Sequence, residues 1–145
     1  MRYLHVDLEK CDGGRHCQRE CEVACAKTLY RTEDVAYSAI RLLPVAGQHD
    51  TLAINVCNQC GVCVAVCPTE ALKQNKLGVV LLDKKACVAC YMCAGFCPTL
   101  SMRTVAGLHE PVKCIVCGAC VKACPTGALQ VVDKPAPEPL IPAGR

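Results

Sequence analysis

The stretch that decides the fold is residues 57–68, CNQCGVCVAVCP, whose cysteines and proline follow the spacing C-x2-C-x2-C-x3-C-P. The same spacing returns at residues 87–98, CVACYMCAGFCP, and at residues 114–125, CIVCGACVKACP. A threonine follows the proline in all three copies, and strand-like stretches follow at 77–82 and 130–132. The sequence therefore predicts a repeated unit of a loop, a short helix and a short strand.

This spacing is typical of ligands to 4Fe–4S clusters. Three cysteines two residues apart lie on one loop and can each bind a different iron, while the fourth follows a helical turn and reaches a neighbouring cluster. The proline fixes φ where the chain leaves the cluster. Gly61 and Gly118 are expected where backbone amides approach sulfur closely. Zinc is the alternative, but structural zinc sites pair two separate two-cysteine knuckles, so three cysteines in each loop favour iron–sulfur.

A further group consists of Cys11, Cys17, Cys21 and Cys25. It departs from the pattern, because its spacing is wider and Ala26 stands where the proline should be. One alignment puts Gly14 at the second cysteine position and leaves Cys25 as an extra thiol, which would give a 3Fe–4S site or an unusual ligand such as His16. The other keeps all four thiols on a stretched loop. We favour the second, because sixteen cysteines divide into four complete sets.

The composition indicates that metal, rather than packing, holds the chain together. It has 145 residues, 16 of them cysteine, with 3% aromatic side chains and no Trp. A core this poor in large side chains gains little from burial alone. Disulfides belong to oxidising compartments, whereas no secretory signal and no membrane-spanning run are recognised. We therefore expect a reducing, cytoplasmic location.

The charge gives no reason to expect a nucleic-acid partner. The formal net charge of +3 counts cysteines as neutral. Four 4Fe–4S clusters with their thiolates would bring the total to about −5, and the basic residues are scattered. No dinucleotide-binding, P-loop or zinc-protease motif is present. We expect a chain without catalytic residues of its own.

Between the first two cysteine groups, residues 39–45 and 51–56 are rich in β-formers and flank a turn signal at 47–50. They predict a hairpin, with Pro44 on an edge strand. Residues 133–145 contain four prolines and predict an extended tail. Because Leu140 and Ile141 are apolar, we expect this tail to dock on a partner.

Two sets of side chains near the cysteines have a structural interpretation. We expect Tyr91, Met92 and Phe96 to fill a small core. We expect the lysines that flank the cysteine groups to be solvated surface charges. These are Lys84, Lys85, Lys113 and Lys122.

Four cysteine groups, an irregular first group without proline and the opening Cys57-Asn58-Gln59-Cys60 resemble a known family. It comprises the four-cluster ferredoxin-like subunits beside molybdenum and tungsten enzymes, formate dehydrogenases, hydrogenases and carbon monoxide dehydrogenases. The resemblance covers roughly residues 4–132. It implies an α+β fold of two bacterial-ferredoxin-like lobes, a nested polyferredoxin, with short helices and hairpins around the clusters. The lobes would be residues 4–25 with 107–132, and residues 51–105, linked by a hairpin within 26–50.

The resemblance also implies which cysteines bind each cluster. One cluster would take Cys11, Cys17, Cys21 and Cys124, and its neighbour in the same lobe would take Cys114, Cys117, Cys120 and Cys25. The third would take Cys57, Cys60, Cys63 and Cys97, and the fourth Cys87, Cys90, Cys93 and Cys67.

Together these features predict a non-catalytic electron-transfer subunit with four 4Fe–4S clusters. It would relay electrons between a catalytic oxidoreductase subunit and a second redox partner. We favour a tungsten or molybdenum aldehyde oxidoreductase as the catalytic partner, and copies of the chain could stack into a longer conductor. The alternatives are a free, diffusible polyferredoxin that serves several enzymes, and a zinc-stapled interaction module.

Overall fold

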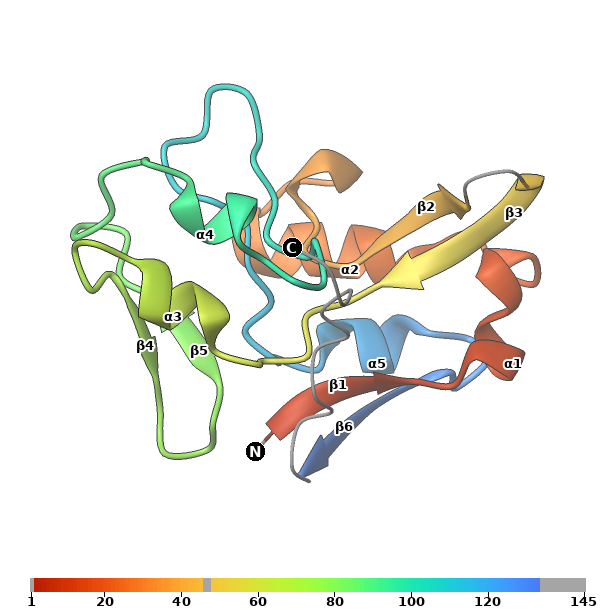
Figure 1. The fold of residues 1–145 in the computed structure, drawn as a ribbon. Helices are drawn as coiled ribbons and strands as arrows, with labels where there is room; N and C mark the ends of the chain where they lie inside the picture. Colours follow the sequence, from red (N-terminus) through yellow and green to blue (C-terminus); the bar gives the residue numbers. More distant parts are fainter. Residues whose placement is uncertain (1, 46–47, 134–145) are drawn as a thin grey trace.

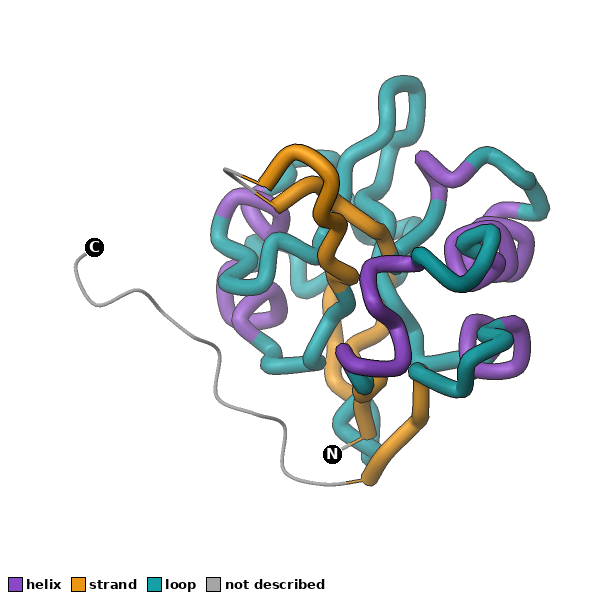
Figure 2. The backbone as a smooth tube through the Cα atoms, turned by 90° about the vertical axis from the view of Figure 1, so that its right-hand side faces the viewer, coloured by secondary structure: helices purple, strands orange, loops and turns teal. Residues whose placement is uncertain are grey.

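The computed structural model describes residues 2–45 and 48–133. In chain order the elements are β1 (Arg2–Val6), α1 (Leu8–Cys11), the 3-10 helix η1 (Asp12–Gly14), α2 (Glu20–Tyr30), the 3-10 helix η2 (Val35–Tyr37), β2 (Arg41–Val45), β3 (Gln48–Asn55), α3 (Val62–Val66), β4 (Leu72–Gln74), β5 (Val80–Leu82), α4 (Met92–Gly95), α5 (Ala119–Ala123) and β6 (Leu129–Asp133). In the view of Figure 2 the short helices lie on both sides of the strands.

The first lobe joins the two ends of the chain. β1 pairs antiparallel with β6, so that Leu4 faces Val131 in the register, and α2 packs against α5. Figure 1 shows these N-terminal and C-terminal elements side by side. The first cysteine group therefore shares a lobe with the last.

The second lobe is built from the middle of the chain. β4 and β5 form an antiparallel pair in which Leu72 faces Leu82, and α3 packs against α4 (Figure 1). Each lobe thus combines one two-stranded sheet with short helices, which are α1, α2 and α5 in the first lobe and α3 and α4 in the second. The predicted α+β fold of short helices and hairpins is confirmed.

A third antiparallel pair, β2 with β3, lies between the first and second cysteine groups. Its register shifts between Pro44 and Val45. The hairpin packs against η1, where a Cβ on Gly13 would stand 2.5 Å from the Leu52 carbonyl oxygen and the backbone has φ +62°. Only glycine fits such a position. Helix α2 meanwhile continues to Tyr30, past the lobe boundary expected at Cys25.

Two side chains expected in the core are exposed, so that prediction is wrong. Met92 is 41% and Phe96 61% exposed. Helix α4 is a single turn whose buried residue is Cys93. Met92 and Phe96 are four residues apart, so they lie together on a face of this turn other than the one that buries Cys93. Tyr91 is half-buried, and its hydroxyl donates to the Leu108 carbonyl at 2.9 Å.

The apolar core is small and contains cysteines. In the first lobe Cys21, Cys25 and Cys120 are buried in one cluster with Leu4 and Leu129. In the second lobe Cys63 and Cys93 are buried with Leu72, Val80 and Met102. The cysteines are therefore part of the packing as well as potential ligands.

Within the described residues, no helix is both long and apolar enough to cross a bilayer. The expectation for the tail falls almost wholly on residues 134–145, which lie outside the part of the chain that the structure describes.

Candidate metal centres

The three regular cysteine loops have the same backbone conformation around the second cysteine. The residue before the second cysteine has a left-handed φ of 59°, 57° and 53° in turn, at Gln59, Ala89 and Val116. The residue after that cysteine is also left-handed, with φ 82°, 55° and 80° at Gly61, Tyr91 and Gly118. In such a conformation successive backbone amides point into one concavity, where they can bind an anion. A Cβ on Gly61 would meet only the Gln74 side chain, at 3.7 Å, so the left-handed backbone accounts for this glycine.

The short helices separate the third cysteine from the fourth. α3, α4 and α5 carry Cys63, Cys93 and Cys120, each of them buried. After α3 and α5 the chain turns to extended backbone, with ψ 114° at both Cys67 and Cys124. A following proline disfavours helical backbone at the preceding residue. The fourth cysteine is thereby directed away from the first three.

Sixteen cysteines line four cavities, four to each. The Cys11 cavity has Cys11, Cys17, Cys21 and Cys124; the Cys114 cavity has Cys25, Cys114, Cys117 and Cys120; the Cys57 cavity has Cys57, Cys60, Cys63 and Cys97; and the Cys87 cavity has Cys67, Cys87, Cys90 and Cys93. Each cavity draws three cysteines from one sequence group and one from another. In each cavity the structure brings together the four cysteines that the resemblance to four-cluster subunits assigns to one cluster.

The irregular first group follows this scheme through α2. Cys21 and Cys25 lie one helical turn apart, yet they line different cavities. The amide of Ala39 donates to the Cys25 sulfur at 3.3 Å. His16 is exposed, 3.3 Å from Asp12, and does not line the Cys11 cavity. Cys25 thus stands where the other groups have their fourth cysteine.

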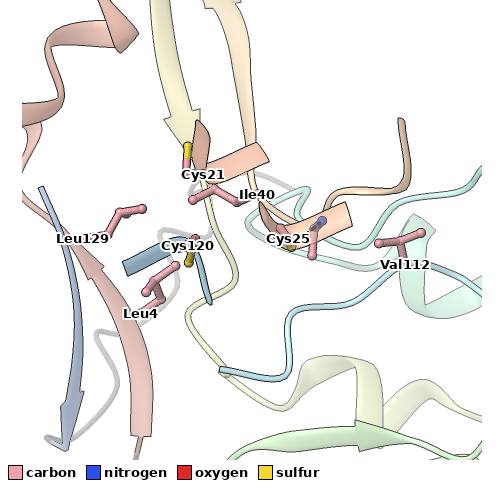
Figure 3. Packing of buried hydrophobic residues seen from close by; sticks show 8 residues of the cluster. Leu4, Cys21, Cys25, Ile40, Val112, Cys120 and Leu129 are labelled. Atoms are coloured by element: carbon pink, nitrogen blue, oxygen red, sulfur yellow. Dashed lines mark hydrogen bonds between the residues drawn. The ribbon is translucent and has the colours of Figure 1, made fainter. Parts of the chain in front are cut away.

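Figure 3 shows the packing of the first lobe around its thiols. Cys21 and Cys120 are buried members of the apolar cluster that also contains Leu4, Ile40 and Leu129, and in this view the Cys120 side chain lies beside Leu4. Apart from the cysteines, the described residues that line the Cys114 cavity are all apolar or glycine. Such walls limit the access of water to the buried cysteines Cys25 and Cys120.

Burial keeps several thiols protonated in the metal-free chain. It raises the pKa of Cys63 to about 11 and the pKa of Cys21, Cys114 and Cys120 to about 12. Thiolate is the form that binds metal, so loading releases these protons.

The pKa values of the cysteines that precede a proline are shifted in the opposite direction. Thr69, Thr99 and Thr126 hydroxyls lie 3.8, 3.5 and 3.5 Å from the sulfurs of Cys67, Cys97 and Cys124. Burial raises the pKa of these thiols, but the threonine hydroxyls and the following backbone amides outweigh it, so each pKa lies below its ordinary value. The threonine repeats visibly in the sequence, but only this contact gives it a role.

The donor set fits 4Fe–4S clusters. Four thiols surround each cavity, which is the ligand number of such a cluster, and left-handed loops direct amides inward. Among residues 2–45 and 48–133, no three Cys, His, Asp or Glu side chains converge on a site for a single metal ion.

Among the four lysines that flank the cysteine groups, Lys113 contradicts the prediction of a solvated surface charge. It is 5% exposed, and its ammonium lies 3.7 Å from the Cys57 sulfur and 3.0 Å from the Cys114 carbonyl. Gln59, fully buried, accepts from that ammonium at 3.0 Å and donates to the same carbonyl at 3.0 Å. In the sequence Lys113 does not differ from the other lysines near ligands. Lys84, Lys85 and Lys122 are exposed, as predicted.

Comparison with known families assigns iron–sulfur binding to two parts of the chain. Residues 56–102 match the model described as a 4Fe-4S dicluster domain, and residues 109–130 match the one described as a 4Fe-4S binding domain. These parts are 4Fe–4S ferredoxin domains, as the cysteine spacing predicted. The first cysteine group lies outside both matches.

Solved structures of similar fold include chains of the active site complex BamBC of benzoyl coenzyme A reductase. The chain from the complex with zinc is 22% identical with a TM-score of 0.50, and the match covers 97% of this chain and 83% of that chain. The chain from the complex with 1,5-dienoyl-CoA is 21% identical with a TM-score of 0.49, over 100% of this chain and 83% of that chain. At this identity the likeness is one of fold. No curated protein matches the sequence.

Proposed function

We propose that this chain, which contains 4Fe–4S ferredoxin domains, holds four 4Fe–4S clusters and relays electrons between a catalytic oxidoreductase subunit and a second redox partner. The observation that carries the proposal is the gathering of sixteen cysteines around four cavities, four to each. The ligands of each cluster are the four cysteines of one cavity, including those of the irregular first group.

Contacts between the cavities support a linear order of the clusters. Gln59 and Lys113 both contact Cys114 from beside the Cys57 cavity, so these two cavities meet at the junction of the lobes. Within each lobe, two cavities exchange their fourth cysteines. The order is therefore the Cys11, Cys114, Cys57 and Cys87 clusters. A line of closely spaced redox sites divides a long electron path into short steps.

Each cluster, when bound, supplies one-electron redox chemistry. The chain's own residues bind iron through cysteine thiolates and exclude water with apolar walls. Threonine hydroxyls and inward-pointing amides stabilise the negative charge on the sulfurs. None of this work requires an acid, a base or a nucleophile, so we assign the chain no catalytic residue.

We further propose that the chain works as a subunit bound to a catalytic partner in the cytoplasm. The favoured partner is a tungsten or molybdenum enzyme of the aldehyde oxidoreductase type. The likeness in fold to chains of an active site complex of a reductase supports a bound subunit over a free carrier. Stacking of copies would extend the conducting line.

The test is purification without oxygen from cells that make the protein, followed by addition of the catalytic subunit's substrate. We expect a larger subunit to co-elute in fixed ratio and its substrate to reduce the clusters. Cys63→Ser removes a buried cysteine of the Cys57 cavity. It should slow the reduction of the clusters that lie past the Cys57 cluster in the line, while the partner stays bound. Lys73→Gln, which changes an exposed side chain of β4, is the control. A chain that elutes alone and is reduced by several unrelated enzymes would instead be a diffusible polyferredoxin.

A further inference from the structure

Lys113 brings a positive charge into the interior of the molecule, between two of the cavities. It lines the Cys57 cavity, and its ammonium donates to the Cys57 sulfur at 3.7 Å, to Gln59 Oε1 at 3.0 Å and to the Cys114 carbonyl at 3.0 Å. Gln59 is held in turn by the Val80 amide, which donates to its Oε1 at 2.9 Å. The ammonium therefore has a fixed position beside one sulfur.

No carboxylate compensates this charge among the described residues. The ion pairs of the structure engage other lysines, such as Lys84, whose ammonium lies 3.0 Å from Glu110. A buried ammonium without an anionic partner is costly. The compensating negative charge must then come from the cavity, where Cys57 is the nearest acidic group.

The four cavities differ in this respect. Among the described side chains, Lys113 is the only cation that lines any of them. Apart from cysteine, no charged side chain of the described residues lines the Cys114 or Cys87 cavity, although the Lys113 ammonium contacts the Cys114 carbonyl from outside, and the Cys11 cavity is lined by Glu20. Similar cysteine ligands thus face three different electrostatic environments.

We propose that Lys113 sets the reduction potential of the Cys57 cluster above those of its three neighbours, so that an electron entering the line comes to rest at an interior position. The inference rests on the proposed function. Reduction adds one negative charge to a cluster that is already anionic with its thiolates. A cation held in a medium of low polarity stabilises the reduced form more than the oxidised form. Lys113 is therefore a positioning and tuning residue, not a ligand.

The test is a redox titration of the clusters by EPR spectroscopy in the purified, cluster-loaded protein. Lys113→Met removes the charge and keeps an unbranched side chain, and Gln59→Glu puts a carboxylate beside the ammonium at nearly constant shape. The control is Lys122→Met, which removes an exposed positive charge from α5. Cys57→Ser identifies the Cys57 cluster, because it changes the signal of that cluster.

We expect the signal assigned to Cys57 to shift to lower potential in both variants, to titrate highest of the four in the unmodified chain and to stay unchanged in Lys122→Met. If Lys113→Met does not load iron, Gln59→Glu decides alone. Unchanged potentials in a variant that holds its full iron would overturn the inference and give Lys113 a packing role. An unmodified chain without four 4Fe–4S signals would contradict the proposed function instead.

Discussion

At the scale of single residues, the threonine after each cysteine–proline pair acts on a sulfur atom. The simplest case is Thr126, whose hydroxyl lies 3.5 Å from the Cys124 sulfur in the Cys11 cavity. When the sulfur is a thiolate, the hydroxyl is the donor. Hydrogen bonds to the sulfurs are one way in which a protein sets a cluster's potential.

We predict that Thr126→Val lowers the potential of the Cys11 cluster. Losing one hydrogen bond of about 1 kcal/mol from the reduced form corresponds to about 40 mV for a one-electron couple. Redox titration of the loaded protein measures the shift, and Thr126→Ser, which keeps the hydroxyl, is the matched control. Equal potentials for the valine and serine variants would show that the hydroxyl has no such effect.

At the scale of elements, a buried carboxylate fixes α2 to the hairpin. Glu22 is 1% exposed; its carboxylate accepts from the Leu42 amide at 2.7 Å and lies 3.5 Å from the guanidinium groups of Arg19 and Arg41. Because α2 carries Cys21 and Cys25, this contact positions thiols for two cavities.

We predict that Glu22→Ala destabilises the loaded protein by about 1–3 kcal/mol, because the buried Leu42 amide loses its acceptor. Denaturant unfolding without oxygen measures the loss, and iron per chain should fall as α2 loosens. Glu33→Ala, which breaks an exposed ion pair with Lys27 of 2.7 Å, should cost under about 1 kcal/mol. Similar losses in the two variants would contradict the role given to Glu22.

The short elements show what the sequence can predict and what it cannot. The repeated cysteine spacing predicts the loops and their order, because the pattern itself fixes where the chain turns. It does not predict α2, since group one lacks the proline that marks the end of each unit. Nor does it predict which face of a one-turn helix is buried, because a single turn is too short to show a repeating pattern of apolar residues. The prediction that Met92 and Phe96 fill a core rests on their apolar character alone, and it is wrong because both lie on the exposed side of α4.

At the scale of the whole molecule, long-range contacts decide what local spacing leaves open. The nested lobes bring Cys25 to the Cys114 cavity and Lys113 to the Cys57 sulfur. Neither contact joins sequence neighbours, and Lys113 resembles the exposed lysines in its local sequence. The ligand types could therefore be predicted residue by residue, whereas the buried charge required the fold.

We predict that iron removal unfolds the chain. Cysteines are buried members of both apolar clusters, and aromatic side chains make up only 3% of the sequence, so burial alone leaves little stability. Chelation without oxygen should abolish a cooperative thermal transition and make the chain sensitive to protease. A metal-free chain that keeps its transition temperature would mean that packing suffices.

The most direct test of the central claim is to measure iron and acid-labile sulfide per chain in protein purified without oxygen. The four cavities predict about sixteen of each, the content of four 4Fe–4S clusters. About twelve of each would mean that the Cys11 cavity holds no cluster and that the line is shorter at that end. Zinc without sulfide would contradict the account as a whole.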